Sequence, residues 1–224
     1  MRVKVDHLTK HAEEIGDRIA VIDDKAGQPV RELNYVVFNE QVNALANGFL
    51  ALGASEGSHI AWWGNNSVEV LLTIHAIRKS GGVSIPIPYR STREEANYLL
   101  GVADVEILVI ENRYVSVIEG LREELPNLKH IITFGMDKEK SVEKTMGEIL
   151  GPVSTPSSEG NFASTHNMIF TSGTTGNPKG AVRKVGGEAN QYGPLLQLLG
   201  WDRMDSLIFL TTGPLYHSGP SGFA

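Results

Sequence analysis

Ten consecutive residues combine the side-chain types that bind phosphate groups. The segment from Thr171 to Gly180 reads TSGTTGNPKG and holds three glycines, four hydroxyl side chains and one lysine. Glycines let the backbone bring N–H groups close to an anion, hydroxyls donate further hydrogen bonds, and lysine adds a positive charge. The apolar run Met168-Ile169-Phe170 directly precedes the segment and has the pattern of a buried strand. The sequence therefore predicts a phosphate-binding loop at the end of a strand.

The first alternative for this segment is the P-loop of a nucleoside triphosphatase. Counted from Gly173, the pattern G-x-x-x-x-G-K-(S/T) requires glycine where this chain has Pro178 and a hydroxyl where it has Gly180. The segment also leads into a strand-like run, residues 181–184, rather than into a helix whose N-terminus could face the phosphates. The second alternative is a surface turn without function, which is disfavoured because random turns seldom unite these residue types with a lysine.

The bulk composition indicates a globular protein without a nucleic-acid partner. Hydrophobic residues make up 41% of the 224 positions, enough for a sizeable core. The net charge is −6 and the basic residues are scattered, which disfavours nucleic-acid binding. The absence of cysteine excludes disulfides and thiolate zinc sites. No apolar run approaches the ~20 residues that cross a bilayer, so no membrane span and a cytoplasmic location are expected.

Alternating strand-like and helix-like segments predict the fold class. An N-terminal helix (7–16), a hairpin (18–23 and 30–35) and a long amphipathic helix ending near Gly53 come first. The expected strands then span residues 59–63, 83–87, 106–110 and 129–134, and the expected helices between them span residues 67–80, 92–100 and 112–125. Because strands that alternate with helices usually pair in parallel, we expect an α/β fold with an open, largely parallel sheet flanked by helices.

The composition also predicts a division of the chain. Residues 1–150 are expected to form a first α/β subdomain, with a charged stretch and a helix at its end. Residues 151–162 are rich in proline, serine and glycine and are expected to form a linker. Residues 163–224 are expected to begin a second, incomplete subdomain that carries the phosphate loop. In that part a helix is expected over residues 188–199 and a strand over residues 206–210.

The loop closely resembles the signature of the AMP-forming adenylate ligases, the superfamily of acyl-CoA synthetases, nonribosomal-peptide adenylation domains and beetle luciferases. Thr171 to Gly180 matches the family pattern (S/T)-S-G-(S/T)-T-G-x-P-K-G at every fixed position. A second family segment, an aromatic-His turn after a strand, is matched by Pro214-Leu215-Tyr216-His217. Upstream, residues 43–57, 63–67, 78–83 and 87–90 look like the first subdomain of the same family. The resemblance covers nearly the whole chain.

This resemblance implies an enzyme that activates a carboxylic acid with Mg-ATP, giving acyl-AMP and pyrophosphate. The residues it implies as holding the β- and γ-phosphates are Thr171, Ser172, Gly173, Thr174, Thr175, Gly176 and Lys179. Lys179 and His217 are the implied catalytic residues, with His217 near the α-phosphate and the carboxylate. A lone histidine is otherwise more often structural. His7 and His11 have helical spacing but no third ligand, so no protein-held metal site is expected.

CoA is the favoured acceptor, because residues 213–219 look like the corresponding segment of bacterial acyl-CoA synthetases for fatty, steroid or related acids. ATP, Mg²⁺ and CoA are thus the expected cofactors, and an apolar carboxylic acid is the expected substrate. An adenylate-forming enzyme with another acceptor is one alternative. The family's ribose-binding acidic residue and distal lysine have no counterpart here, so a truncated product, inactive alone, is expected. The other alternative is a non-catalytic fragment that binds nucleotide, a complementary chain or a second copy of itself.

Overall fold

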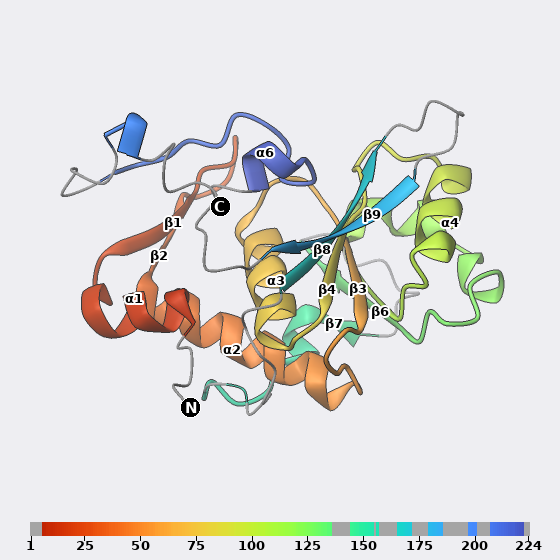
Figure 1. Cartoon of the computed structure of the whole chain (residues 1–224), viewed down its shortest axis with the longest axis horizontal. Helices are drawn as coiled ribbons and strands as arrows, with labels where there is room; N and C mark the ends of the chain where they lie inside the picture. The colour runs from red at the N-terminus through yellow and green to blue at the C-terminus, as the bar shows by residue number, and fades with distance from the viewer. Residues whose placement is uncertain are drawn as a thin grey trace.

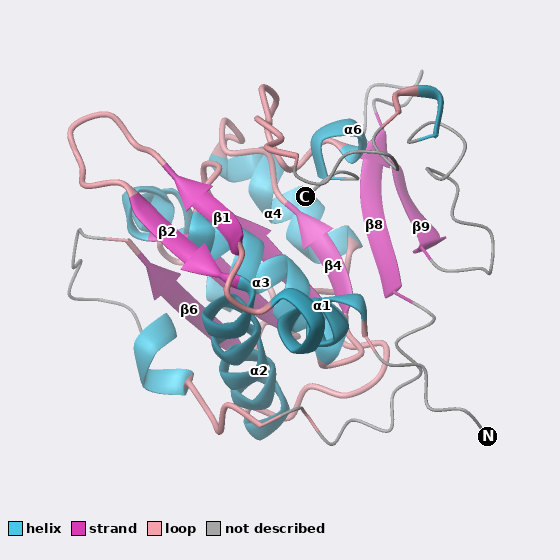
Figure 2. Ribbon diagram, turned by 90° about the vertical axis from the view of Figure 1, so that its left-hand side faces the viewer, coloured by secondary structure: helices cyan, strands magenta, loops and turns pink. Residues whose placement is uncertain are grey.

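The computed structural model describes residues 6–135, 144–154, 156, 165–171, 179–185, 197–200 and 207–221. In this part of the chain, helices cover both faces of a central sheet, and a separate hairpin stands beside the N-terminal helix (Figures 1 and 2). The helix is α1 (His7–Ile15), and the hairpin pairs β1 (Ile19–Asp23) antiparallel with β2 (Arg31–Asn34). The predicted helix and hairpin are confirmed.

The central sheet has the strand order β7-β6-β5-β3-β4-β8-β9. The strands are β3 (His59–Trp63), β4 (Val83–Pro86), β5 (Ile107–Glu111), β6 (His130–Phe134), β7 (Lys144–Thr145), β8 (Thr165–Thr171) and β9 (Lys179–Val185). All neighbouring pairs from β7 to β8 are parallel, and only β9 runs antiparallel to its neighbour. This confirms the expected α/β fold with a largely parallel sheet.

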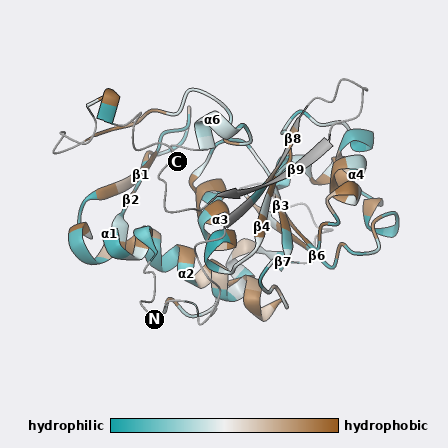
Figure 3. Cartoon of the chain, viewed as in Figure 1, coloured by the Kyte–Doolittle hydropathy of each residue, from teal (hydrophilic) through white to brown (hydrophobic). Residues whose placement is uncertain are grey.

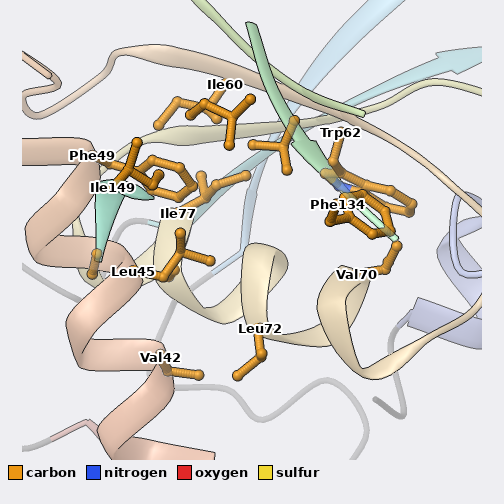
Figure 4. Close-up of a cluster of buried hydrophobic side chains, with 14 of the residues drawn as sticks. Val42, Leu45, Phe49, Ile60, Trp62, Val70, Leu72, Ile77, Phe134 and Ile149 are labelled. Carbon is orange, nitrogen blue, oxygen red and sulfur yellow. The ribbon is translucent and has the colours of Figure 1, made fainter. Parts of the chain in front are cut away.

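Two groups of helices cover opposite faces of this sheet. α2 (Tyr35–Ala51) and α3 (Val68–Lys79) pack on one face, and α4 (Arg93–Val102) packs on the other. Figure 3 shows hydrophobic residues gathered along the strands and on parts of these helices, and Figure 4 shows apolar side chains of α2 and α3 packed against Ile60 and Trp62 of β3. α3 follows β3 on one face of the sheet, and α4 follows β4 on the opposite face. The direction in which successive strands are added therefore reverses at β3, and open α/β sheets form ligand-binding crevices at such a reversal.

The described helices begin where the sequence predicts but do not all have the predicted form. Ser67 caps α3 by accepting a hydrogen bond from the backbone N of Val70 at 3.2 Å, and Thr92 with Glu95 forms a capping box on α4. The helix expected over residues 112–125 is instead two short 3₁₀ segments, η1 (Asn112–Ile118) and η2 (Leu121–Glu123). Gly120 lies between them with φ +75°, which interrupts any continuous helical hydrogen-bond ladder. The helix expected before residue 150 is also a 3₁₀ segment, η3 (Met146–Ile149).

The last part of the chain departs furthest from the predictions. The strand expected over residues 206–210 is wrong for residues 207–210, which lie outside any strand and leave Ile208 83% and Leu210 79% exposed. No described strand lies beside these residues to accept their backbone hydrogen bonds, and an apolar pattern alone does not form a strand. Most of the helix expected over residues 188–199 lies outside the described residues.

The segments on either side of the expected linker share one sheet. β8 pairs in parallel with β4 through Val83 opposite His166 and Ser84 opposite Asn167. The division into two subdomains stays a prediction. In the described part of the chain, no helix is both long enough and apolar enough to cross a membrane.

The burial of His75 on α3 predicts that the fold is sensitive to acid. Its ring meets the edge of Phe38 at a centroid distance of 5.4 Å, and its Nδ1 has no hydrogen-bond partner among the described residues. Burial of the ring, together with the charges of Arg78 and Lys79 and against the opposing charge of Asp6, lowers the pKa of His75 to about 3. His75 therefore binds a proton near pH 6.5 in the unfolded chain, whereas it stays neutral at that pH in the folded chain.

Stability should consequently fall as the pH drops from 6.5 towards 3, by up to about 1.4 kcal/mol per pH unit from this residue alone. His75→Gln removes that titration, so its urea midpoint should decline less steeply than the wild-type midpoint between pH 6.5 and 4. His7 is exposed and offers the matched control, His7→Gln, which should keep the wild-type slope. Equal slopes for wild type and His75→Gln would contradict the prediction.

Candidate functional site

The predicted phosphate loop joins the two strands of a hairpin. β8 and β9 pair antiparallel, with Thr171 opposite Lys179 and Phe170 opposite Gly180. The backbone of Thr171 and of Lys179 thus marks the two ends of the loop. Residues 172–178, which include the predicted Ser172, Gly173, Thr174, Thr175 and Gly176, lie outside the described residues. Because Thr171 ends a strand of the parallel sheet, the loop leaves from the carboxyl edge, where ligands of such sheets bind.

The segment that carries His217 is attached to the same edge. Asn66, in the loop after β3, donates from Nδ2 to the carbonyl oxygen of Gly213 and accepts at Oδ1 from the backbone N of Leu215, both at 2.9 Å. The side chain of Leu215 is buried in the apolar cluster that α2 and α3 form with one face of the sheet. These contacts connect two parts of the chain that lie nearly 150 residues apart in sequence, and they fix the predicted aromatic-His turn beside the sheet.

Aromatic contacts hold the turn from the neighbouring strand. Tyr89, which follows β4, meets Tyr216 at a ring-centroid distance of 5.7 Å and an interplanar angle of 65°. The ring of Tyr216 lies 4.4 Å from that of His217, whose backbone N donates to the carbonyl oxygen of Pro214 at 3.1 Å. His217 is exposed and directly precedes the short helix α6 (Ser218–Ser221). Its imidazole is therefore presented to solvent at the edge where the phosphate loop emerges.

A second polar network fixes the loop after β3. The backbone N of Asn65 donates to Glu111 Oε2 at 2.9 Å, and the hydroxyl of Tyr114 donates to Asn65 Oδ1 at 3.2 Å. Tyr114 also stacks on Trp63, with ring centroids 5.8 Å apart. Burial and the nearby charge of Glu111 raise the pKa of Tyr114, so this hydroxyl keeps its proton and remains a donor at neutral pH. Glu111 and Tyr114 consequently hold the loop that carries Asn66, through the backbone and the side chain of Asn65.

His217 and the phosphate loop as site residues stay predictions, and the sequence reasoning did not name Asn66 and Tyr89 as candidates for the site. Both residues come three positions after a strand, and Asn66 was considered only as part of a helix cap and of a family-like segment. The carboxyl-end position of these polar residues was an available signal. No group of three or more His, Cys, Asp or Glu side chains able to hold a metal occurs among the described residues, which is in keeping with the expectation from sequence but does not test it.

The sequence profile of the AMP-binding enzyme family matches residues 8–221, and the chain belongs to this family. It is 26% identical over 190 residues to a medium/long-chain-fatty-acid–CoA/3-oxocholest-4-en-26-oate–CoA ligase of Mycobacterium marinum, covering 80% of this chain and 34% of the relative. It is 27% identical over 201 residues to an indoleacetate–CoA ligase of Aromatoleum aromaticum, covering 85% and 37%. The chain thus spans about a third of the length of these relatives.

Solved structures support the fold assignment. A protein of Rhodopseudomonas palustris described as a long-chain-fatty-acid CoA ligase superposes with a TM-score of 0.82 at 22% identity, over 96% of this chain and 52% of that one. A long-chain-fatty-acid-CoA ligase of Archaeoglobus fulgidus superposes with a TM-score of 0.74 at 19% identity, over 97% and 43%. At these identities the likeness concerns the fold alone. The predicted membership of the adenylate-forming superfamily is confirmed by the family profile over residues 8–221.

Proposed function

We propose that this chain supplies the ATP phosphate-binding part of an AMP-forming carboxylate–CoA ligase. The observation that carries the proposal is the common position of two family segments. The β8–β9 hairpin sends its glycine- and hydroxyl-rich loop from the carboxyl edge of the sheet, and Asn66 and Tyr89 attach the His217 turn to the same edge. A loop suited to phosphate binding and an exposed imidazole that start from one sheet edge support an adenylation reaction, which depends on positioning and on stabilising charge at the phosphates.

The residues of this chain fit the phosphate end of Mg-ATP. A loop with four hydroxyls, three glycines and Lys179 offers many donors and a positive charge for phosphate oxygens. Bound Mg-ATP supplies the electrophilic α-phosphorus and pyrophosphate as leaving group. Lys179 and the loop from Thr171 to Gly176 hold the β- and γ-phosphates and neutralise the charge that develops on departing pyrophosphate. His217 donates a hydrogen bond that orients the α-phosphate and the attacking carboxylate.

The acceptor and the acid are supported by the relatives. The M. marinum and A. aromaticum proteins are CoA ligases by name, as is a crotonobetaine/carnitine–CoA ligase of Salmonella paratyphi B that is 28% identical over 179 residues. Their acids range from fatty and steroid acids to an indole acid and carnitine, so the shared feature is a carboxylate. We infer CoA as the acceptor. We also propose an apolar carboxylic acid as the substrate, because the acids named for the M. marinum and A. aromaticum proteins are largely apolar, whereas the carnitine named for the Salmonella relative is polar.

Thioester formation tests this inference. The full-length gene product is incubated with Mg-ATP and a panel of fatty, aromatic and steroid acids, with and without CoA. We expect AMP and acyl-CoA when an acid and CoA are both present. Release of acyl-AMP without any thioester, for every acid that is activated, would contradict CoA as the acceptor and favour a different acceptor.

The 224-residue chain alone provides the test of the non-catalytic alternative. ATP binding without pyrophosphate exchange by this chain, beside exchange by the full-length gene product, would favour a nucleotide-binding product that acts with other residues. Exchange by the 224-residue chain itself would contradict that alternative. Light scattering of the same sample would show whether the exposed residues 207–210 promote self-association.

A further inference from the structure

We propose that Asn66 is a positioning residue that fixes the direction of His217 at the carboxyl edge of the sheet. This inference rests on the proposed function, since it concerns the same site. Asn66 itself touches no reacting group. Its side chain acts through the Gly213–Leu215 backbone, which lies two residues before His217.

The two hydrogen bonds of Asn66 have a geometry that suits an amide best. Gly213 presents a carbonyl oxygen, which needs a donor, and Leu215 presents an N–H, which needs an acceptor. A carboxamide supplies one of each from a single planar group of fixed width. An aspartate in the same place would still accept from Leu215 but would bring a negative charge against the carbonyl oxygen of Gly213.

Asn66 determines the orientation of the turn that carries His217, whereas the buried side chain of Leu215 determines how closely the turn lies to the sheet. Leu215 is 2% exposed and anchors the turn in the core, while its backbone N–H points to Asn66. Tyr216 leans on Tyr89, and the backbone of His217 closes on Pro214. Without the amide, the buried side chain of Leu215 still holds the turn near the sheet, but the backbone can rotate about that anchor. His217 then loses its fixed direction.

The residues on either side of Asn66 are held in place by hydrogen bonds. Asn65 is held through Glu111 and Tyr114, and Ser67 is the N-cap of α3. Asn66 itself is exposed, so its replacement removes two hydrogen bonds without opening a cavity in the core. A loss of activity in an Asn66 variant then reflects a changed position of His217 rather than a loss of folding.

A double-mutant cycle in the full-length gene product tests the proposal. Carboxylate-dependent exchange of pyrophosphate into ATP is measured for wild type, Asn66→Ala, His217→Ala and the double variant. Since displacing a reacting group by about 1 Å can cost about 100-fold, we expect Asn66→Ala to lower kcat about 10- to 100-fold with little change in the KM for ATP. In the His217→Ala background, Asn66→Ala should lower kcat less than about two-fold, because the imidazole that Asn66 positions is absent.

Asn127→Ala is the matched control. It removes an exposed asparagine whose amide binds Asp104 at the amino edge of the sheet, and it should leave kcat unchanged. Hydrogen exchange at the Leu215 amide gives a readout independent of catalysis. It should accelerate in Asn66→Ala and stay slow in Asn66→Asp, which retains the acceptor.

The outcomes separate the two proposals. If the wild type catalyses exchange, two results would overturn the role of Asn66 and leave the ligase assignment intact. One is an unchanged kcat in Asn66→Ala, and the other is an equal loss of kcat on Asn66→Ala in the wild-type and His217→Ala backgrounds. Absence of exchange in the wild type with every acid tried would overturn the ligase assignment, and the role of Asn66 with it.

Discussion

Lys179→Ala in the full-length gene product should slow carboxylate-dependent pyrophosphate exchange at subsaturating ATP by about 100-fold, since one lost donor to developing charge typically costs that much or more. Lys179 is the first residue of β9 and pairs with Thr171 across the hairpin, so it lies where the phosphate loop ends. A lysine beside the β- and γ-phosphates stabilises the transition state as pyrophosphate departs. The fold should be retained, because Lys179 is the terminal residue of β9 and its backbone pairing with Thr171 does not depend on its side chain.

Lys184→Ala is the matched control for this experiment. Lys184 lies on the same strand, opposite His166 and at the end of the hairpin remote from the loop. Its replacement removes one positive charge from β9 without touching the phosphate site, so exchange should match that of the wild type. Unchanged exchange in Lys179→Ala, or an equal loss in both variants, would remove Lys179 from the site.

The second large effect is expected on stability, from a buried charge cluster between α1, α2 and α3. The Lys79 side chain is 0% exposed, and its Nζ lies 2.9 Å from Thr9 Oγ1, 2.7 Å from Asn43 Oδ1 and 3.3 Å from Asp6 Oδ2. Burial tends to raise the pKa of Asp6, but the charges of Arg78 and Lys79 outweigh it, and the pKa lies below its ordinary value. Asp6 is thus held as a buried carboxylate by these two cations.

Lys79→Met keeps the aliphatic stem and removes the charge. It should lower the free energy of unfolding by about 3 kcal/mol, because removing one partner of a buried ion pair leaves the other buried and insufficiently compensated. Urea denaturation at pH 7 provides the measurement. Lys10→Met is the control, since Lys10 and Glu14 form an exposed pair with side chains 55% and 57% accessible, and its loss should cost less than about 0.5 kcal/mol. Equal stability of the two variants would show that Lys79 does not hold Asp6.

Local signals in the sequence were sufficient for most of the first 135 residues. Phe38, Val42, Leu45 and Phe49 predict α2 because their spacing forms one buried helix face, and all four are at most 3% exposed. The caps at Ser67 and Thr92 are equally local, since a hydroxyl and the N–H groups three residues on lie within one turn. The phosphate loop was predicted from its residue types rather than from its surroundings, and because residues 172–178 lie outside the described residues it stays a prediction.

Interactions between distant residues were beyond such reasoning. The strand order places β3 between β4 and β5, which no local pattern encodes. The apolar pattern of residues 207–210 predicts a strand, but a strand needs a neighbour, and none is described beside it. Asn66 resembles an ordinary residue before a helix until the chain brings Gly213 and Leu215 to it. The site therefore depends on contacts that only the fold creates.

Exchange of labelled pyrophosphate into ATP by the full-length gene product tests the central claim most directly. The proposed ligase should incorporate label only when a suitable carboxylic acid is present, and CoA should not be required for this half-reaction. A broad panel of fatty, aromatic and steroid acids that supports no exchange, in a protein that still binds ATP, would contradict the assignment.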